Sequence, residues 1–323
     1  MLQQENAPPN LEAGFCLSLN DSHALKPERS MSDSRSAPHA RAKRPAAAPS
    51  RATAVKLWRA PDVLDAVMLK GEFVGHRYPP HAHDTHCLVL ITSGSVVVDI
   101  AGHVDTLRRG DIVALDADTM HAAHAGESGS WKMRVAYFLP DDLAAYTGSI
   151  GLPVRSRLDV RAAVIRDAPL AQSVYGVNWC SEVNDDPFKR SETLAFAIGH
   201  MLSVHAAHRT ALPSPRVEPR VIRSVKEQLQ SDLAGRFTLA SLAADHALTP
   251  FVLLRAFIRS AGLSPHAYQQ QARIRYAQKR LKQGAAIALV AREAGYADQA
   301  HFTRVFKQYT GVTPKSFQIA LTG

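Results

Sequence analysis

The chain repeats one pattern near its C-terminal end: residues 241–268 read SLAADHALTPFVLLRAFIRSAGLSPHAY, and residues 288–317 read ALVAREAGYADQAHFTRVFKQYTGVTPKSF. Matched positions lie 48 residues apart before the turn and 49 apart after it, so the second turn is one residue longer. The matched pairs share apolar, basic, glycine or proline character: Leu242 and Val290, Arg255 and Arg304, Phe257 and Phe306, Gly262 and Gly311, Pro265 and Pro314. Such a repeat indicates two copies of one supersecondary unit.

Each copy carries the start and stop signals of a capped helix. Thr249 and Asp298 are favourable N-caps for the second helix of their copies, and Gly262 and Gly311 are favourable stops. A short helix, a tight turn and a second capped helix form the arrangement whose second helix enters the major groove of DNA. The repeat therefore predicts two helix-turn-helix units.

The stretch that joins the two units, residues 265–283, is predicted to form a single helix. Its apolar residues are expected to face inward: Ile274, Ala277 and Leu281. Its basic residues are expected to face largely outward: Arg273, Arg275, Lys279, Arg280 and Lys282. At about 1.5 Å per residue this helix is roughly 28 Å long, near the 34 Å of one DNA turn. One chain can therefore place both second helices in successive major grooves.

The basic charge is concentrated in the C-terminal third of the chain. Residues 216–323 hold 16 Lys and Arg against 6 Asp and Glu, whereas residues 55–215 hold 15 against 18. An excess of this size favours a polyanion as partner, and nucleic acid first, because neutralised phosphates release their counterions. Two alternatives remain at this point: a solvated basic surface without a partner, and a plain helical bundle.

Residues 216–323 resemble the DNA-binding domain of the AraC/XylS family of transcription regulators over its full length. The string AREAGYADQAHFTRVFKQYTGVTPKSF, residues 291–317, is similar to the family signature nearly throughout. The resemblance implies that the second helix of each unit contacts double-stranded DNA through these residues: Gln299, His301, Thr303 and Arg304 in the second unit, and Phe251, Leu254 and Arg255 in the first. Lys279, as a phosphate contact, and Lys307 complete the predicted DNA-binding set.

One residue departs from the family pattern, because a polar side chain is more usual where Leu254 stands. Base reading by the first unit therefore rests on Arg255 and on apolar contact with a thymine methyl. Arginine suits this role because its guanidinium matches the O6 and N7 edge of guanine.

The N-terminal half has a different pattern. Short runs of β-forming residues, separated by Gly or Asp, occupy residues 55–139: AVMLKGEFVG, HCLVLITSG, SVVVDIAG, DIVALDAD and WKMRVAYFL are examples. Regular short strands with turn residues between them predict an antiparallel sandwich or barrel. Helical segments are expected after Asp141.

Three histidines stand out among these strands. His81 and His83 alternate on one face of a strand, and His121 can reach them across a barrel, so the three can share a metal ion. The spacing resembles the two cupin motifs, but Cys87 or Leu88 stands where the usual glutamate ligand would be. Sensor domains of AraC-type regulators share this barrel, and the resemblance implies an effector bound without metal. Effector-pocket, metal-binding and structural histidines all stay open, and no cofactor is otherwise expected.

The predicted effector site contains these histidines and the nearby groups able to orient a small polar or acidic ligand. The set is Arg77, Tyr78, His81, His83, His86, His121, Trp131 and Arg134.

The fold class that follows is α+β with two domains: a cupin-like antiparallel β-barrel with flanking helices, and an all-α domain with two helix-turn-helix units joined by a long helix. The expected divisions are a disordered extension (1–53), the effector-binding barrel (54–150), a helical dimerisation and linker region (151–212), and the DNA-binding domain (216–323). The helical region has an apolar stripe that either packs on the barrel or pairs with a second copy: Leu194, Ile198, Met201, Leu202 and His205.

Cysteine usage and hydropathy indicate the cellular compartment of the protein. Cys16, Cys87 and Cys180 are odd in number and far apart, which predicts neither a disulfide framework nor a cysteine zinc site. No run approaches the roughly 18 apolar residues of a membrane span. A cytoplasmic protein without a membrane partner is therefore expected.

The sequence thus predicts a DNA-binding transcription regulator that is not an enzyme and whose barrel senses a small-molecule effector. A homodimer is expected, and contact with RNA polymerase is compatible with this function. Two alternatives stay open: a metal-dependent cupin enzyme fused to a DNA-binding domain, and an architectural DNA-binding protein that senses nothing.

Overall fold

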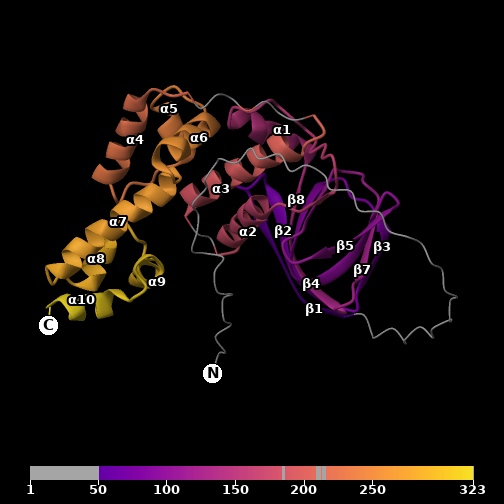
Figure 1. Cartoon of the computed structure of the whole chain (residues 1–323), viewed down its shortest axis with the longest axis horizontal. Helices are drawn as coiled ribbons and strands as arrows, with labels where there is room; N and C mark the ends of the chain where they lie inside the picture. Colours follow the sequence, from indigo (N-terminus) through magenta and orange to yellow (C-terminus); the bar gives the residue numbers. More distant parts are fainter. Residues whose placement is uncertain (1–50, 184–185, 209–211, 213–215, 323) are drawn as a thin grey trace, which may run out of the picture.

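The computed structural model describes residues 51–183, 186–208, 212 and 216–322 (Figure 1). The predicted disordered extension, residues 1–53, lies outside the described residues up to residue 50. The prediction of disorder is wrong for residues 51–53, because they belong to the first strand, which begins at Arg51. Within the described ranges, no helix is both long and apolar enough to cross a membrane.

The N-terminal half is an antiparallel β-structure, as the sequence predicts. Its described strands are β1 (Arg51–Ala60), β2 (Ala66–Val74), β3 (Arg77–His81), β4 (His86–Ile100), β5 (His103–Arg108), β6 (Ile112–Leu115), β7 (His121–Ala125), β8 (Ser130–Phe138) and β9 (Val164–Ile165). One layer has the order β1-β2-β8-β4-β6-β9, and the other contains β3, β7 and β5 beside β4.

Strand β4 belongs to both layers. Its first half pairs with β6 and β8, and its second half pairs with β5 and β7. Gly94 lies between the halves with a φ of 72°, and a Cβ there would clash with the backbone of Ser130. A left-handed backbone in contact with another strand requires glycine. Because β4 joins the two layers, they enclose an apolar interior that includes Phe73, Val98 and Trp131.

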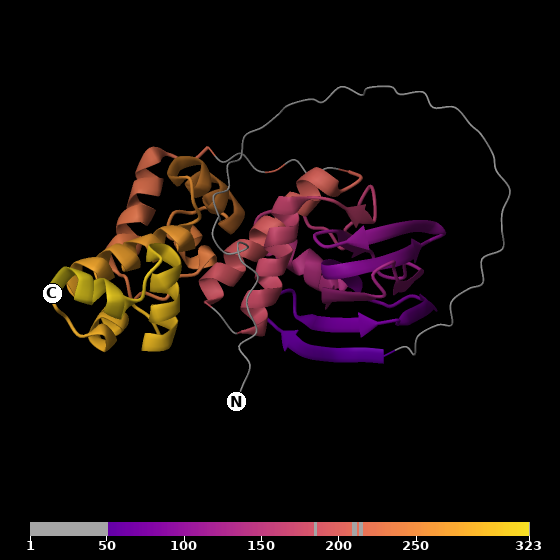
Figure 2. The same cartoon turned by 60° about the horizontal axis from the view of Figure 1, so that its bottom comes forward.

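Three α-helices and a π-helix follow β8, with β9 between the first two: α1 (Pro140–Ser149), α2 (Ala168–Glu182), α3 (Pro187–His200) and η1 (Met201–His205). Helices α2 and α3 lie between the sheet and the C-terminal helices (Figures 1 and 2). The apolar stripe residues Leu194, Ile198, Met201 and Leu202 are buried in one core with the sheet. The alternative that they pair with a second copy is therefore wrong, and the partly exposed His205 lies off this core.

The C-terminal half is helical: α4 (Pro219–Ser231), α5 (Leu239–Ala244), α6 (Pro250–Ala261), α7 (Pro265–Lys282), α8 (Ile287–Glu293), α9 (Gln299–Thr310) and α10 (Pro314–Thr322). Helices α5 and α6 form the first predicted unit, α8 and α9 form the second, and α7 joins them. The predicted caps are confirmed: Thr249 caps α6, Asp298 caps α9, and Gly262 and Gly311 end these helices in left-handed conformations.

The two units belong to different hydrophobic cores. Phe251, Leu254 and Phe257 of the first unit share a continuous core with Leu194 of α3 and with the outer face of the sheet. The second unit has a core of its own, built from α7, α8 and α9: Ile274, Ala277, Leu281, Val290, Ala291, Ala294, Tyr296, Phe302 and Phe306. The first unit is thus packed as an extension of the N-terminal half.

Candidate DNA-binding surface and effector pocket

Helix α9 presents the predicted contact residues of the second unit. Asp298 accepts a hydrogen bond from the backbone N–H of His301 at 2.7 Å, which fixes the first turn of the helix. The inward residues are Phe302 and Phe306, which are fully buried. The remaining predicted residues lie on the other faces: Gln299, Arg304 and Lys307 are exposed, and His301 and Thr303 are partly exposed. This helix therefore offers an accessible polar and basic surface, and its DNA contacts stay predictions.

Helix α6 differs, and two predictions for it are wrong. Phe251 is 3% exposed and Leu254 is 1% exposed, so neither can contact DNA in this conformation. The physical reason is hydrophobic burial: both side chains are removed from water in the core shared with α3. Arg255 remains partly exposed, and its guanidinium lies 5.8 Å from the ring centre of Phe251.

The first turn of α6 is held by the N-terminal half. The backbone N–H of Phe251 donates a hydrogen bond to the carbonyl oxygen of Ile150 at 3.2 Å. Any side chain at Gly151 would clash with Thr249, and any side chain at Gly199 of α3 would clash with the Phe251 ring. These close approaches show that the beginning of α6 fits tightly against α3 and the end of α1.

Helix α7 carries exposed basic residues between the two units. Lys279 is exposed, as the phosphate-contact prediction requires, and so are Arg275 and Lys282. Arg273 does not face outward as predicted: it is 6% exposed, and its Nε–H donates a hydrogen bond to the Leu233 carbonyl oxygen at 2.8 Å. The Arg273 side chain therefore helps to hold α7 in place and adds no positive charge to the exposed surface.

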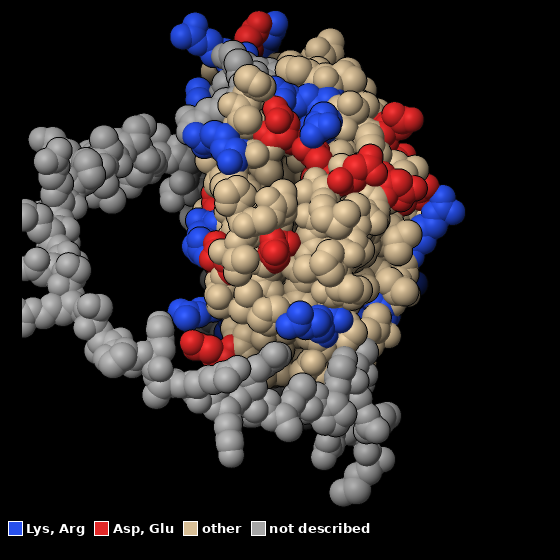
Figure 3. Space-filling model, turned by 90° about the vertical axis from the view of Figure 1, so that its right-hand side faces the viewer, with Lys and Arg blue, Asp and Glu red and all other residues tan. Residues whose placement is uncertain are grey.

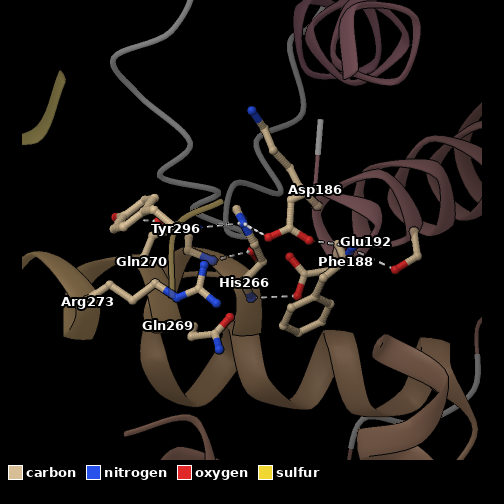
Figure 4. Close-up of polar contacts among 12 residues, drawn as sticks. Asp186, Phe188, Glu192, His266, Gln269, Gln270, Arg273 and Tyr296 are labelled. Carbon is tan, nitrogen blue, oxygen red and sulfur yellow. Dashed lines mark hydrogen bonds and ion pairs between the residues drawn. The ribbon is translucent and has the colours of Figure 1, made fainter. Parts of the chain in front are cut away.

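A buried polar cluster links α3 to the start of α7 (Figure 4). The Glu192 carboxyl accepts a hydrogen bond from the backbone N–H of His266 at 2.7 Å. His266 Nε2 lies 3.5 Å from the Asp186 carboxylate. Burial raises the pKa of Glu192 to about 8, whereas hydrogen bonding to His266 holds the pKa of Asp186 below its usual range despite burial.

The same cluster extends to the second unit. The Gln270 amide nitrogen lies 3.1 Å from His266 Nε2, and its amide oxygen accepts a hydrogen bond from the Tyr296 hydroxyl at 2.9 Å (Figure 4). Tyr296 lies in the turn between α8 and α9, and its ring packs edge-on against His301 at 5.5 Å. One chain of contacts therefore runs from α3 to the first turn of α9. Sequence reasoning missed it because it joins residues far apart in the chain.

The β-structure encloses a cavity of about 80 Å³. Its wall is mostly apolar, with Tyr78, His81, His121 and Tyr137 as polar groups and Trp131 as the largest ring. At about 10 to 15 Å³ for each water, the space accepts roughly five to eight water-sized groups. A cavity of this size suits a small molecule. On the outside of this domain, the centre of the face in Figure 3 carries few charged side chains.

The three predicted histidines lie near one another at this cavity. The ring centres of His81 and His121 are 4.3 Å apart, and those of His83 and His121 are 5.1 Å apart. The Nδ1 atom of each lies within hydrogen-bonding distance of a backbone carbonyl oxygen. Nε2 of His83 is buried and has no hydrogen-bond partner among the described residues. In the described ranges, however, these three do not bring one ligand atom each within 4.8 Å of the others.

Four predicted effector residues do not line the cavity, and His83, beside His121, is one of them. Arg77 is exposed on β3. His86 is buried on the opposite face of β4, where Nε2 contacts the Ser156 carbonyl oxygen at 2.9 Å. Arg134 is buried on the opposite face of β8, where it donates a hydrogen bond to Glu182 of α2 at 2.6 Å.

Strand alternation explains these corrections. Neighbouring residues on a strand point to opposite faces, so Cys87, Val89 and Ile91 line the cavity while His86 does not. In the same way Met133 lines it and Arg134 does not. The alternation of residues along β4 and β8 is therefore the sequence signal that could have identified these apolar wall residues.

Comparisons with known proteins agree with this architecture. The family model of an AraC-like ligand binding domain matches residues 65–181, and that of a helix-turn-helix domain matches residues 242–319. The chain is 24% identical over 242 residues to the uncharacterized HTH-type transcriptional regulator YbfI of Bacillus subtilis, covering 74% of this chain and 85% of that protein. It is 24% identical over 263 residues to the HTH-type transcriptional activator RhaR of Shigella flexneri, covering 76% and 90%.

A shorter match has higher identity. Over 106 residues the chain is 34% identical to the arabinose operon regulatory protein of Escherichia coli, covering 32% of this chain and 36% of that protein. A ligand-binding β-domain followed by a helix-turn-helix domain defines a transcription regulator. The chain belongs to the AraC family of transcriptional regulators.

Proposed function

We propose that α9 reads DNA directly while the N-terminal half holds α6, and that a small molecule in the barrel changes this hold. The contact of the first turn of α6 with Ile150 carries the proposal. Recognition helices contact base edges with their N-terminal residues, so one turn cannot serve DNA and Ile150 at the same time. The equivalent turn of α9 has an exposed Gln299.

The effector we propose is a small molecule with an apolar body and few polar groups. The apolar cavity wall supports the first property, and Tyr78, His81, His121 and Tyr137 support the second. Strand β8 connects this cavity to the helices, because Tyr137 lines it and Arg134 on the other face bonds to Glu182 of α2. Such a molecule regulates only if it binds the held and released states with different affinity.

The test is a variant that loosens the hold without touching the barrel. Gly199→Ala inserts a methyl group against the Phe251 ring and separates α3 from α6. We expect footprints on operator DNA to lengthen from one protected half-site to two, about one helical turn apart. Gly176→Ala in α2 is the matched control, since its added methyl would meet only the Thr193 methyl at 3.1 Å, a tight contact that a shift of a few tenths of an ångström relieves.

A footprint that already covers two half-sites for the wild-type protein without effector would contradict the proposed hold. An unchanged single half-site in Gly199→Ala, with the variant folded as judged by thermal unfolding, would do the same.

Several finer features belong to this proposal. The domain divisions are a barrel over 51–150, a helical linker region over 151–212 and a DNA-binding domain over 216–323. We propose a homodimer, for which Val55 and Leu57 on edge strand β1 offer exposed apolar surface. Sedimentation of the Leu57→Lys variant tests this proposal.

We propose that the protein acts in the cytoplasm, beside DNA and RNA polymerase, because its regulatory role requires both.

We also propose that the protein is not an enzyme. Its relatives are named as transcriptional regulators, and the position of the usual cupin glutamate holds Cys87 or Leu88. Burial raises the pKa of the Cys87 thiol to about 12, so this side chain stays protonated and is a poor metal ligand.

A further inference from the structure

A second histidine cluster lies outside the barrel, on the helices. His200 is the last residue of α3, His205 is the last residue of η1, and Asp167 is the N-cap of α2. Nε2 of each histidine lies 2.8 Å from the same oxygen, Oδ2 of Asp167. These three ligand atoms all lie within 4.8 Å of one another.

The π-helix brings the two histidines together. Residues five apart on an α-helix point about 140° apart, because each residue turns the helix by about 100°. In a π-helix the repeat is longer, with i to i+5 hydrogen bonds, so residues five apart return to the same side. Such segments are rare and occur frequently at functional sites. Segment η1, Met201–His205, therefore places His205 beside His200.

Asp167 is oriented for a ligand role. Its Oδ1 accepts a hydrogen bond from the backbone N–H of Leu170 at 2.9 Å, which leaves Oδ2 directed at the histidines. A carboxylate that is fixed by a backbone hydrogen bond is the kind of support that metal ligands receive in proteins.

The cluster is reachable from solvent. The side chains of Asp167, His200 and His205 are 14%, 19% and 20% exposed. A cavity of about 240 Å³ lies beside His205 and is also lined by Arg161 and Arg166. An ion bound here would keep positions open for water or a small anion.

We propose that Asp167, His200 and His205 bind one divalent transition-metal ion, with Zn²⁺ as the probe ion, through a carboxylate oxygen and two imidazole nitrogens. Imidazole and carboxylate are ligands that Zn²⁺ takes readily. On binding, the N–H of each ring moves from Nε2 to Nδ1, and the ion replaces the two hydrogen bonds to Oδ2. The site ties the start of α2 to the end of α3, directly before the residues that lead to α4.

The experiment measures Zn²⁺ affinity of the full chain by competition with a chromophoric chelator, and Co²⁺ absorption as a report on ligand geometry. We expect one tight site in the wild-type protein, at least about tenfold weaker binding in Asp167→Asn, and loss of that site in His200→Ala/His205→Ala. Asn is as good an N-cap as Asp, so Asp167→Asn keeps the start of α2 and remains folded. Zn²⁺ should raise the unfolding temperature of the wild-type protein by more than that of either variant.

His81→Ala/His121→Ala is the matched control, because it removes two histidines from the barrel cluster and leaves the helical cluster intact. Its tight site should be unchanged. If the wild-type protein has no site tighter than the His200→Ala/His205→Ala variant, or if Asp167→Asn binds as tightly as wild type, the proposal is overturned. A tight site lost only in the control would assign the ion to the barrel and overturn it as well.

Discussion

Helices α6 and α9 occupy equivalent places in two copies of one sequence pattern, yet their surroundings differ. Both have 12 residues, begin at a side-chain cap and end at a glycine with positive φ. In α6, however, six residues are buried, whereas in α9 only Phe302 and Phe306 are. The local signals that make the helices are therefore shared, and the neighbour α3 makes the difference.

The sequence contains the cause of this difference. Phe251 and Leu254 of α6 correspond to Ala300 and Thr303 of α9 at the repeat separation of 49. Large apolar side chains gain free energy when another protein surface covers them, whereas small and polar ones lose little by staying in water. A helix-turn-helix unit with apolar residues on its outer face thus docks on protein, and one without them stays accessible.

The largest expected effects come from the two cores. Phe306→Ala and Phe257→Ala should each cost about 3 to 5 kcal/mol, because each removes a fully buried ring. Phe306→Ala should raise hydrogen exchange in α8, α9 and the part of α7 that packs on them but not in α3, since the second unit has a separate core. Phe257→Ala should raise it in α3 as well as α6. Equal exchange changes in α3 for both variants would contradict the separation of the cores.

The loss of DNA affinity should differ between substitutions of Arg304 and of Arg255. Arg304→Ala should weaken specific binding by about 1 to 3 kcal/mol and relax preference at one base pair, measured by titration of operator and random DNA. Arg255→Ala should have little effect in the wild-type background and a comparable effect when combined with Gly199→Ala. Equal losses on specific and random DNA would instead assign Arg304 to phosphate.

The buried Glu192 predicts a pH dependence of the α3–α7 contact. Its folded pKa of about 8 lies above the ordinary value of 4.5, so its stabilising contribution is complete below pH 4.5 and is lost as pH rises through 8. The free energy of unfolding should therefore fall by up to about 1 kcal/mol per pH unit in this window. Glu192→Gln, which cannot ionise, should flatten this slope in denaturant titrations. A slope unchanged in the variant would assign it to other groups.

The smallest effect concerns α7, between the two units. Lys279→Ala should reduce the slope of log affinity against log salt by about one and leave sequence preference unchanged, because the exposed ammonium contacts phosphate in our prediction. Lys132→Ala, which removes a lysine paired with Glu72 on the β-structure, is the matched control and should leave the slope unchanged.

Local patterns predicted most of the fold. Helix caps at Thr249 and Asp298 were predictable because they depend on one side chain and a backbone N–H three residues away. The antiparallel β-structure was predictable because strand alternation and turns repeat regularly. The side of each strand on which a given polar residue lies was less secure, and His86 and Arg134 were assigned to the wrong face for this reason.

What the sequence determined by itself was therefore the set of elements, the repeat, the basic C-terminal third and the family. These follow from spacing, composition and local hydrogen bonding. Only the tertiary structure decided that α3 covers α6, that a polar cluster joins Glu192 to Tyr296, and that Asp167 meets His200 and His205. Each of these contacts joins residues distant in the chain, and burial and chain closure, which no local pattern encodes, bring them together.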